Sequence, residues 1–110
     1  MIVTKITDKN FVEETAKKVP IIIDFNANWC APCNMLDPIF ARVSDEFPAD
    51  IIRFGKLSAA DFPDLTEKHK IEGIPCMIIF KEGKEVGRIV GFFQRTKLKE
   101  KITEALKKIN

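Results

Sequence analysis

Two cysteines separated by two residues, Cys30 and Cys33, carry the strongest chemical signal in the sequence. They come shortly after an apolar run at 21–25 and stand where a helix is predicted to begin, with Pro32 tolerated in its first turn. The start of a helix presents N–H groups without partners and the positive end of the helix dipole, which together stabilise a thiolate at position 30. One turn along, Cys33 can attack a mixed disulfide formed on Cys30. The spacing therefore predicts thiol–disulfide exchange.

A zinc site is the main alternative for such a cysteine pair, with His69 and Cys76 as the remaining ligands. Zinc ribbons and fingers, however, bring their ligands from turns that carry paired Cys or His residues. His69 and Cys76 are instead separated by an apolar stretch that includes Ile71, Ile74 and Pro75. We therefore expect no metal site. A purely structural disulfide is also disfavoured, because so short a loop gains little from cross-linking.

Asp24 is the second chemical signal, because it lies inside the apolar run at 21–25. An ionised carboxylate in a buried strand is costly unless it is paired or neutralised, so burial should raise the pKa of Asp24. A raised pKa suits a general acid or base that works near neutral pH. A strand-end aspartate that caps a loop is the alternative. The cysteine pair that begins six residues downstream favours the functional interpretation.

The alternation of apolar and polar residues predicts elements in the order β-α-β-α-β-α-β-β-α. Strands are predicted at 2–6, 21–25, 51–57, 76–80 and 85–90, and helices at 8–18, from 30 or 31 to about 47, at 61–70 and at 96–109. Asp8 is expected to cap the first helix, with Phe11, Val12 and Ala16 facing inward. Pro38 lies inside the second helix and should kink it.

The character of the strands predicts the fold class. The run at 21–25 is nearly all apolar and β-branched, which is typical of a central strand in a parallel sheet covered by helices on both faces. The short alternating strand at 2–6 suits a sheet edge. The turn around Gly83 joins the last two strands as an antiparallel hairpin. We therefore expect an α/β fold with a mixed sheet between helices.

Composition and charge exclude several other classes of protein. The chain has 110 residues, 18 basic against 16 acidic side chains and a net charge of +2, and its basic residues are scattered, so nucleic acid and anionic membranes are poor partners. No apolar run approaches the roughly 20 residues of a membrane span, and the first residues do not suit an uncleaved signal peptide. Three cysteines, an odd number, argue against a secreted disulfide framework. We expect a single cytoplasmic domain over 1–110.

Together these residues resemble the thioredoxin family, over essentially the whole chain. The features that match in order and spacing are Ile23-Asp24-Phe25, Trp29-Cys30-Ala31-Pro32-Cys33, Pro38, Lys56-Leu57, Gly73-Ile74-Pro75 and Gly91. The resemblance implies the thioredoxin fold, a central five-stranded mixed sheet with an antiparallel hairpin, flanked by four helices. It also implies a thiol–disulfide oxidoreductase that reduces disulfides in partner proteins, needs no cofactor of its own, acts as a monomer, and is recycled by a thioredoxin-reductase-type electron donor.

The resemblance also assigns roles to individual positions. Cys30 is similar to the exposed nucleophile of the family and Cys33 to its more buried resolving thiol. Asp24 is similar to the buried carboxylate that exchanges a proton with the resolving thiol, and Lys56 to the neighbour whose charge modulates the pKa of that carboxylate. Pro75 is similar to the family's cis-proline. The residues that would line the apolar substrate-binding surface are Trp29, Ala31, Pro32, Ile74, Pro75 and Gly91. There the backbone of Ile74 could pair with an extended substrate segment.

Three positions depart from the family pattern. Ala31 replaces a glycine, Asn26 stands where many relatives carry an aromatic residue, and Cys76 stands where threonine is common. We interpret Cys76 as a small core residue in preference to a redox residue. The pair between the cysteines carries no histidine, which favours a reductant over an oxidant. An oxidant or isomerase of the same fold, and a thioredoxin-like module that only binds partners, stay open as alternatives.

Overall fold

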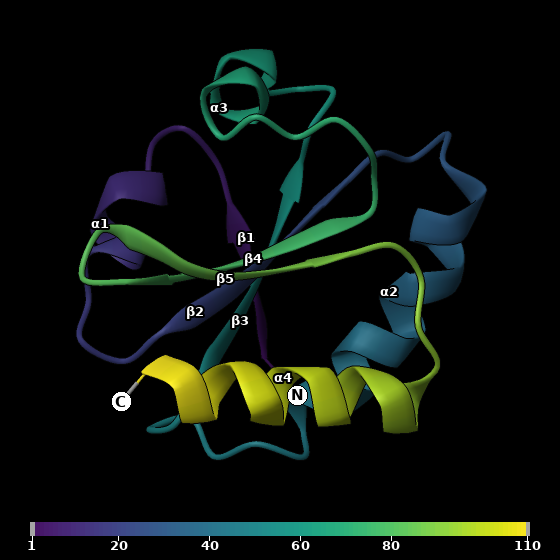
Figure 1. Cartoon of the computed structure of the whole chain (residues 1–110). Coiled ribbons are helices and arrows are strands. Elements are labelled where there is room, and N and C mark those ends of the chain that lie inside the picture. Colours follow the sequence, from purple (N-terminus) through teal and green to yellow (C-terminus); the bar gives the residue numbers. More distant parts are fainter. Residues whose placement is uncertain (1, 110) are drawn as a thin grey trace.

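The computed structural model describes residues 2–109. Within that range its elements are β1 (Val3–Ile6), α1 (Phe11–Thr15), β2 (Ile21–Asn26), α2 (Ala31–Ser44), β3 (Arg53–Ser58), α3 (Pro63–Lys68), β4 (Cys76–Lys81), β5 (Lys84–Val90) and α4 (Arg95–Ile109). This order is the predicted one. In Figure 1 the strands cross the centre of the molecule and the helices lie around them.

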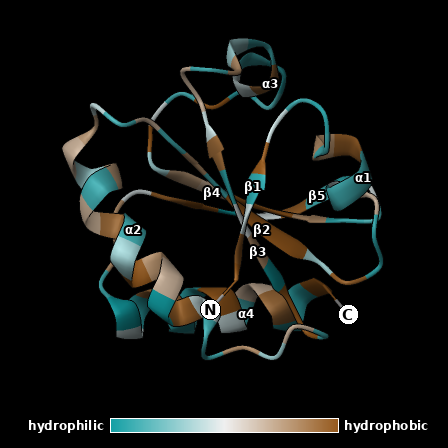
Figure 2. Ribbon diagram, turned by 180° about the vertical axis from the view of Figure 1, so that it is seen from behind, coloured by the Kyte–Doolittle hydropathy of each residue, from teal (hydrophilic) through white to brown (hydrophobic). Residues whose placement is uncertain are grey.

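The five strands form one mixed sheet in the order β1-β3-β2-β4-β5. β3 pairs in parallel with both β1 and β2, whereas β4 is antiparallel to β2 and to β5. Every residue of β2 is buried, as its apolar sequence predicted, and β1 lies at the edge. Figure 2 shows this apolar strand at the centre of the sheet. The mixed five-stranded sheet with four helices confirms the predicted fold class.

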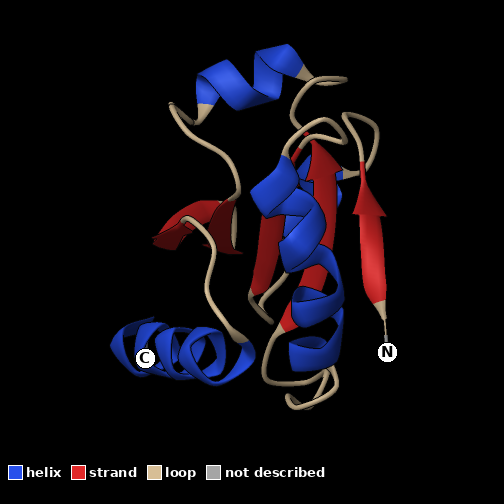
Figure 3. Cartoon of the chain, turned by 90° about the vertical axis from the view of Figure 1, so that its right-hand side faces the viewer, coloured by secondary structure: helices blue, strands red, loops and turns tan. Residues whose placement is uncertain are grey.

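Each face of the sheet is covered by a different pair of helices. Successive strand residues point to opposite faces, so Ile22 packs on one side of β2 while Ile21 and Ile23 pack on the other. α2 and α4 cover the first face, with Leu36, Phe40, Val43, Phe54, Met77, Ile79, Leu98 and Ile102 in its core. α1 and α3 cover the second, with Ile6, Phe11, Phe25, Leu57, Cys76, Ile78 and Phe80 in its core. Figure 3 shows α4 nearly end-on while α2 runs upright beside the strands.

The first and third helices are shorter than predicted. α1 begins after Asn10, not after Asp8, and its five residues bury only Phe11 and Thr15, one turn apart. The expectation that Val12 and Ala16 face inward is wrong: Val12 is 76% exposed and Ala16 is exposed. So short a helix presents only one narrow stripe to the sheet. α3 begins at Pro63, which suits the first helical position.

Candidate active site

The end of β2 and the start of α2 place Cys30 and Cys33 together. β2 ends at Asn26, the N–H of Cys30 donates to the carbonyl of Ala27 across 3.2 Å, and α2 begins one residue later. Cys30 therefore occupies the N-cap position, and Pro32 lies in the first turn, where its missing N–H has no helical partner to lose. The prediction that the second helix begins at this cysteine is confirmed.

The two cysteines are in direct contact. The backbone N–H of Cys33 donates to Cys30 Sγ across 3.3 Å, so sulfur takes the place that an oxygen usually fills at a helix N-cap. This donor and the positive end of α2 both favour negative charge on Cys30 Sγ. Both residues are free thiols. The arrangement suits a sulfur nucleophile with a second thiol one turn away.

The two thiols differ in burial. Cys30 is 7% exposed and Cys33 is 1% exposed, so Cys30 is the more accessible, although it is more covered than an exposed nucleophile would be. Its cover includes the half-buried Ile74, whose carbonyl oxygen lies 3.9 Å from Cys30 Sγ. Burial, and next its hydrogen bond with Cys30, raise the pKa of the Cys33 thiol. Cys33 therefore keeps its proton at neutral pH until a base removes it.

The loop before β4 and the end of β5 lie beside the thiols. The Ile74–Pro75 peptide bond is cis, as the family resemblance implied. The carbonyl of Pro75 accepts the N–H of Gly91 across 2.9 Å, which ties this loop to the end of β5. Gly91 has φ of 103°, a backbone conformation that favours glycine, and a Cβ added there would meet no atom within 4 Å. The surface at Gly91 is thus open.

The residues expected to bind substrate differ in exposure. Trp29 is 74% exposed, and Ala31 and Pro32 are also exposed on the first turn of α2. Ile74 and Gly91 are half-buried, while Pro75 is buried and contributes to the shape beneath the surface. An apolar surface of this kind, with Trp29 at its rim, suits contact with a protein partner.

Asp24 is fully buried beneath the cysteines, on the face of β2 that α2 covers. Its side chain is 0% exposed, which confirms the predicted burial. Asn26 Nδ2 donates to Asp24 Oδ2 across 3.4 Å, and Asp24 Oδ1 has no hydrogen-bond partner among the described residues. Burial raises the pKa of Asp24 to about 7, and the hydrogen bond from Asn26 partly offsets that effect. A carboxyl group with this pKa can give or take a proton near neutral pH.

Lys56 lies opposite Asp24 in the sheet but does not pair with it. The two residues are partners in the register of β2 and β3, as expected for a neighbour of the carboxylate. The Lys56 ammonium is nevertheless 2.8 Å from Asp37 Oδ2, on α2. Asp37 was not among the residues that the sequence predicted for the site. Its position four residues after Cys33, on the same side of the helix, is the signal that could have identified it.

His69 and Cys76, the ligands considered for zinc, lie on the other side of the sheet. The His69 ring is 5.2 Å from the rings of both Phe11 and Phe80, and Cys76 is 1% exposed in the core beneath α1 and α3. Residues 2–109 contain no group of three or more His, Cys, Asp or Glu side chains that could hold a metal ion. Cys76 is thus a core residue, and burial raises the pKa of its thiol.

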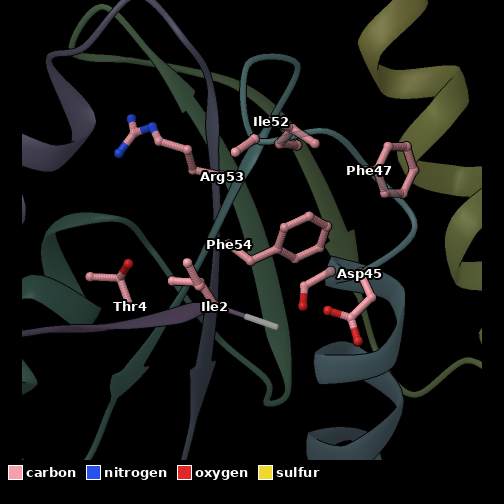
Figure 4. Close-up of a pocket in the computed structure, with 9 residues that line it drawn as sticks. Ile2, Thr4, Asp45, Phe47, Ile52, Arg53 and Phe54 are labelled. Carbon is pink, nitrogen blue, oxygen red and sulfur yellow. The ribbon is translucent and has the colours of Figure 1, made fainter.

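A separate pocket of about 420 Å³ lies at the far end of α2 from the cysteines. Figure 4 shows Ile2, Phe47, Ile52 and Phe54 around it, with Asp45 at its rim. Its lining comes from the first residues of β1 and β3 and from the end of α2, whereas the thiols follow the end of β2. The exchange chemistry therefore belongs to the other end of the molecule.

The chain matches a known protein family over most of its length. The family model described as Thioredoxin matches residues 2–104. The chain belongs to the thioredoxin family. It is 36% identical over 108 residues to a thioredoxin of Staphylococcus haemolyticus, covering 96% of this chain and 100% of the relative. It is 35% identical over 98 residues to a thioredoxin of Rickettsia bellii, covering 88% and 92%.

The fold comparison agrees with the family assignment. The crystal structure of Malassezia sympodialis thioredoxin matches with a TM-score of 0.83 at 28% identity, over 96% of each chain. As a member of the thioredoxin family, the chain is a thiol–disulfide oxidoreductase that reduces disulfides in partner proteins and receives electrons from a reductase. No helix within residues 2–109 is long and apolar enough to cross a membrane.

Proposed function

We propose that Cys30 is the nucleophile and Cys33 the resolving thiol of this thioredoxin-family reductase. The observation that carries the proposal is the 3.3 Å hydrogen bond from the Cys33 N–H to Cys30 Sγ at the start of α2. Cys30 as thiolate attacks one sulfur of a substrate disulfide. A bond forms between Cys30 and that sulfur, the substrate S–S bond breaks, and the other substrate sulfur leaves as a thiolate that takes up a proton.

The second step requires Cys33 to lose its proton. The Cys33 thiolate then attacks Cys30 Sγ, the bond between Cys30 and the substrate breaks, and the second substrate thiol is released. The enzyme dithiol has become a disulfide, and the substrate disulfide has gained two electrons and two protons. The raised pKa of Cys33 makes this step dependent on a base.

Asp24 is the base for that second step. With a pKa of about 7 it is ionised in an appreciable fraction of molecules at neutral pH, and it accepts a proton far more strongly than an ordinary aspartate. It is the buried carboxylate on the face of the sheet that α2 covers, and its charge is among the influences that raise the pKa of Cys33. The proton can then pass from Asp24 to the departing substrate thiolate or to solvent.

Substrates bind on the apolar surface around Cys30. Trp29, Ala31 and Pro32 form its exposed part. The Ile74 carbonyl lies 3.9 Å from Cys30 Sγ, and Pro75 and Gly91 are joined to each other by a backbone hydrogen bond. An extended substrate segment can pair with the backbone of Ile74, because strand addition needs little sequence specificity. The surface therefore suits a broad range of protein disulfides.

The chain acts as a single domain over residues 1–110, as a monomer in the cytoplasm, and as an electron carrier in the control of cellular redox state. A flavoenzyme of the thioredoxin-reductase type returns the Cys30–Cys33 disulfide to the dithiol. The family match over 2–104 supports one domain, and the net charge of +2 gives no support for nucleic-acid or membrane partners.

Turnover of a protein disulfide with dithiothreitol as electron donor tests the proposal. Cys30→Ser should abolish turnover, while Cys33→Ser should stop after one step and accumulate a mixed disulfide on Cys30. Cys76→Ala is the matched control, since it removes a thiol from the opposite face of the sheet and should keep turnover near that of the wild type. Turnover by Cys30→Ser, or its loss in Cys76→Ala with the fold intact, would rule out these assignments.

A further inference from the structure

An ion pair beside Asp24 has no role in the exchange steps described above. Lys56 Nζ lies 2.8 Å from Asp37 Oδ2, and the two side chains are 43% and 34% exposed. The other carboxylate oxygen, Asp37 Oδ1, is buried and has no hydrogen-bond partner among residues 2–109. One side of Asp37 is therefore turned into the protein and away from water.

The fold brings this pair to the proton-transfer site from two elements. Asp37 follows Cys33 by four residues on α2, so both side chains lie on the same side of that helix. Lys56 and Asp24 are register partners on β3 and β2, so their side chains project from the same face of the sheet. One thiol, two carboxylates and one ammonium thus meet between α2 and the sheet.

A single ammonium cannot neutralise both carboxylates equally. Lys56 is engaged by Asp37, and within residues 2–109 the one hydrogen bond to the Asp24 side chain comes from the neutral amide of Asn26 at 3.4 Å. A nearby negative charge opposes ionisation of a carboxyl group and a nearby positive charge favours it. Asp37 raises the pKa of Asp24 by more than Lys56 lowers it. The balance of charges therefore leaves Asp24 more basic than a Lys56–Asp24 pair would.

We propose that Asp37 is a positioning residue for disulfide exchange, which holds the Lys56 ammonium away from Asp24 and so keeps Asp24 a strong enough base to take the proton of Cys33. The inference deepens the proposed function and rests on the role of Asp24 in it. In the proton-transfer step, Cys33 loses a proton and Asp24 gains it.

No other group described around Asp24 holds the Lys56 ammonium away from it. Cys33 faces it from α2, and Cys76 lies on β4 with its side chain in the opposite core. Met77, the β4 register partner of Asp24, does not titrate. Asn26 and Lys56 also line a pocket of about 530 Å³ beside β1.

Titration of the Asp24 carboxyl by carbon-13 NMR tests the inference. The experiment uses a Cys30→Ser, Cys33→Ser background, so that no active-site thiol titrates in the same range. Asp37→Asn removes a negative charge and frees Lys56, so we expect the Asp24 midpoint to fall by about one pH unit. Lys56→Gln should raise the midpoint, and the double variant should return it close to its starting value.

A matched control separates this effect from general loss of surface charge. Lys99 and Glu46 form an ion pair of 3.2 Å with similar exposure, 47% and 28%, outside the site. Glu46→Gln should leave the Asp24 midpoint unchanged. An Asp37→Asn shift no larger than that of Glu46→Gln would overturn the inference, and so would shifts of the same sign for Asp37→Asn and Lys56→Gln.

The kinetic readout uses the native cysteines. In Asp37→Asn the rate of mixed-disulfide resolution should reach its midpoint at lower pH and level off several-fold below the wild-type plateau, because a weaker base removes the Cys33 proton less effectively. Asp37→Glu should restore most of that plateau. If wild-type Asp24 titrates like an ordinary aspartate, the proposed base itself is wrong. If Asp24 titrates near neutral pH but its midpoint does not change in Asp37→Asn, only this inference fails.

Discussion

The backbone N–H of Cys33 donates to Cys30 Sγ across 3.3 Å, so the proposed resolving residue also supports the proposed nucleophile. The first turn of α2 thus affects both sulfur atoms. Its N-terminal donors favour negative charge on the first sulfur, while the second sulfur, 1% exposed, stays protonated. The two thiols are thus made unequal by their positions, at the N-cap and in the first turn of α2, which suits the proposed order of exchange.

Asp24→Asn should stabilise the fold at neutral and alkaline pH. The pKa of Asp24 is raised from 3.8 to about 7 in the folded protein, so its contribution to stability is complete below about pH 4 and is lost as pH rises through about 7. For one fully buried group the loss is on the order of 4 kcal/mol. The free energy of unfolding, measured by denaturant titration across this range, should therefore fall with pH more steeply for wild type than for Asp24→Asn.

The free energies of unfolding of wild type and Asp24→Asn, compared at low and at high pH, test that prediction. At about pH 4 the neutral acid and the amide differ little, so the two proteins should have similar stability. At about pH 8 the variant should be more stable by a few kcal/mol. An amide hydrogen of the new side chain left without a partner would lower this gain in stability. Parallel pH curves for the two proteins would show that Asp24 does not have the raised pKa assigned to it.

Gly91→Ala should destabilise the protein and weaken substrate binding. Gly91 has φ of 103°, which costs a residue with a side chain on the order of 1–2 kcal/mol. A Cβ would meet no atom within 4 Å, so the cost comes from the backbone alone. A strained backbone there should shift Pro75, whose carbonyl accepts the Gly91 N–H, and raise KM for a protein disulfide.

Gly73→Ala is the control for that substitution. Gly73 lies in the loop before β4, two residues ahead of Pro75, is equally open around its Cβ, and does not have a positive φ. Its replacement should leave thermal stability and KM close to wild type. Equal effects at the two positions would show that the positive φ of Gly91 is not what the surface depends on.

Much of the fold could be predicted because its signals are local. The apolar run of β2 indicates a central strand, the alternation in β1 an edge strand, and the turn at Gly83 an antiparallel hairpin. Together they predict the mixed sheet. The limits of α1 could not be predicted in the same way. Val12 continues a helical apolar pattern yet is 76% exposed, because five residues present too narrow a face to bury it.

The site divides in a similar way. Cys30, Cys33 and Asp24 are recognisable because cysteine spacing and a charge within an apolar run are visible in one dimension. The ion-pair partner of Lys56 cannot be recognised in this way, because Asp24 on β2 and Asp37 on α2 both lie near the Lys56 ammonium on β3. Which carboxylate holds the ammonium depends on side-chain geometry that no single segment specifies.

The central claim, that Cys30 and Cys33 form a reversible two-electron couple, is tested most directly by redox titration of the Cys76→Ala protein in glutathione buffers, followed by peptide mapping of the oxidised form. We predict a single two-electron transition more reducing than the glutathione couple, with the bridge mapped to Cys30 and Cys33. An oxidised form without that bridge, or one in which the two thiols react independently with glutathione, would contradict the account.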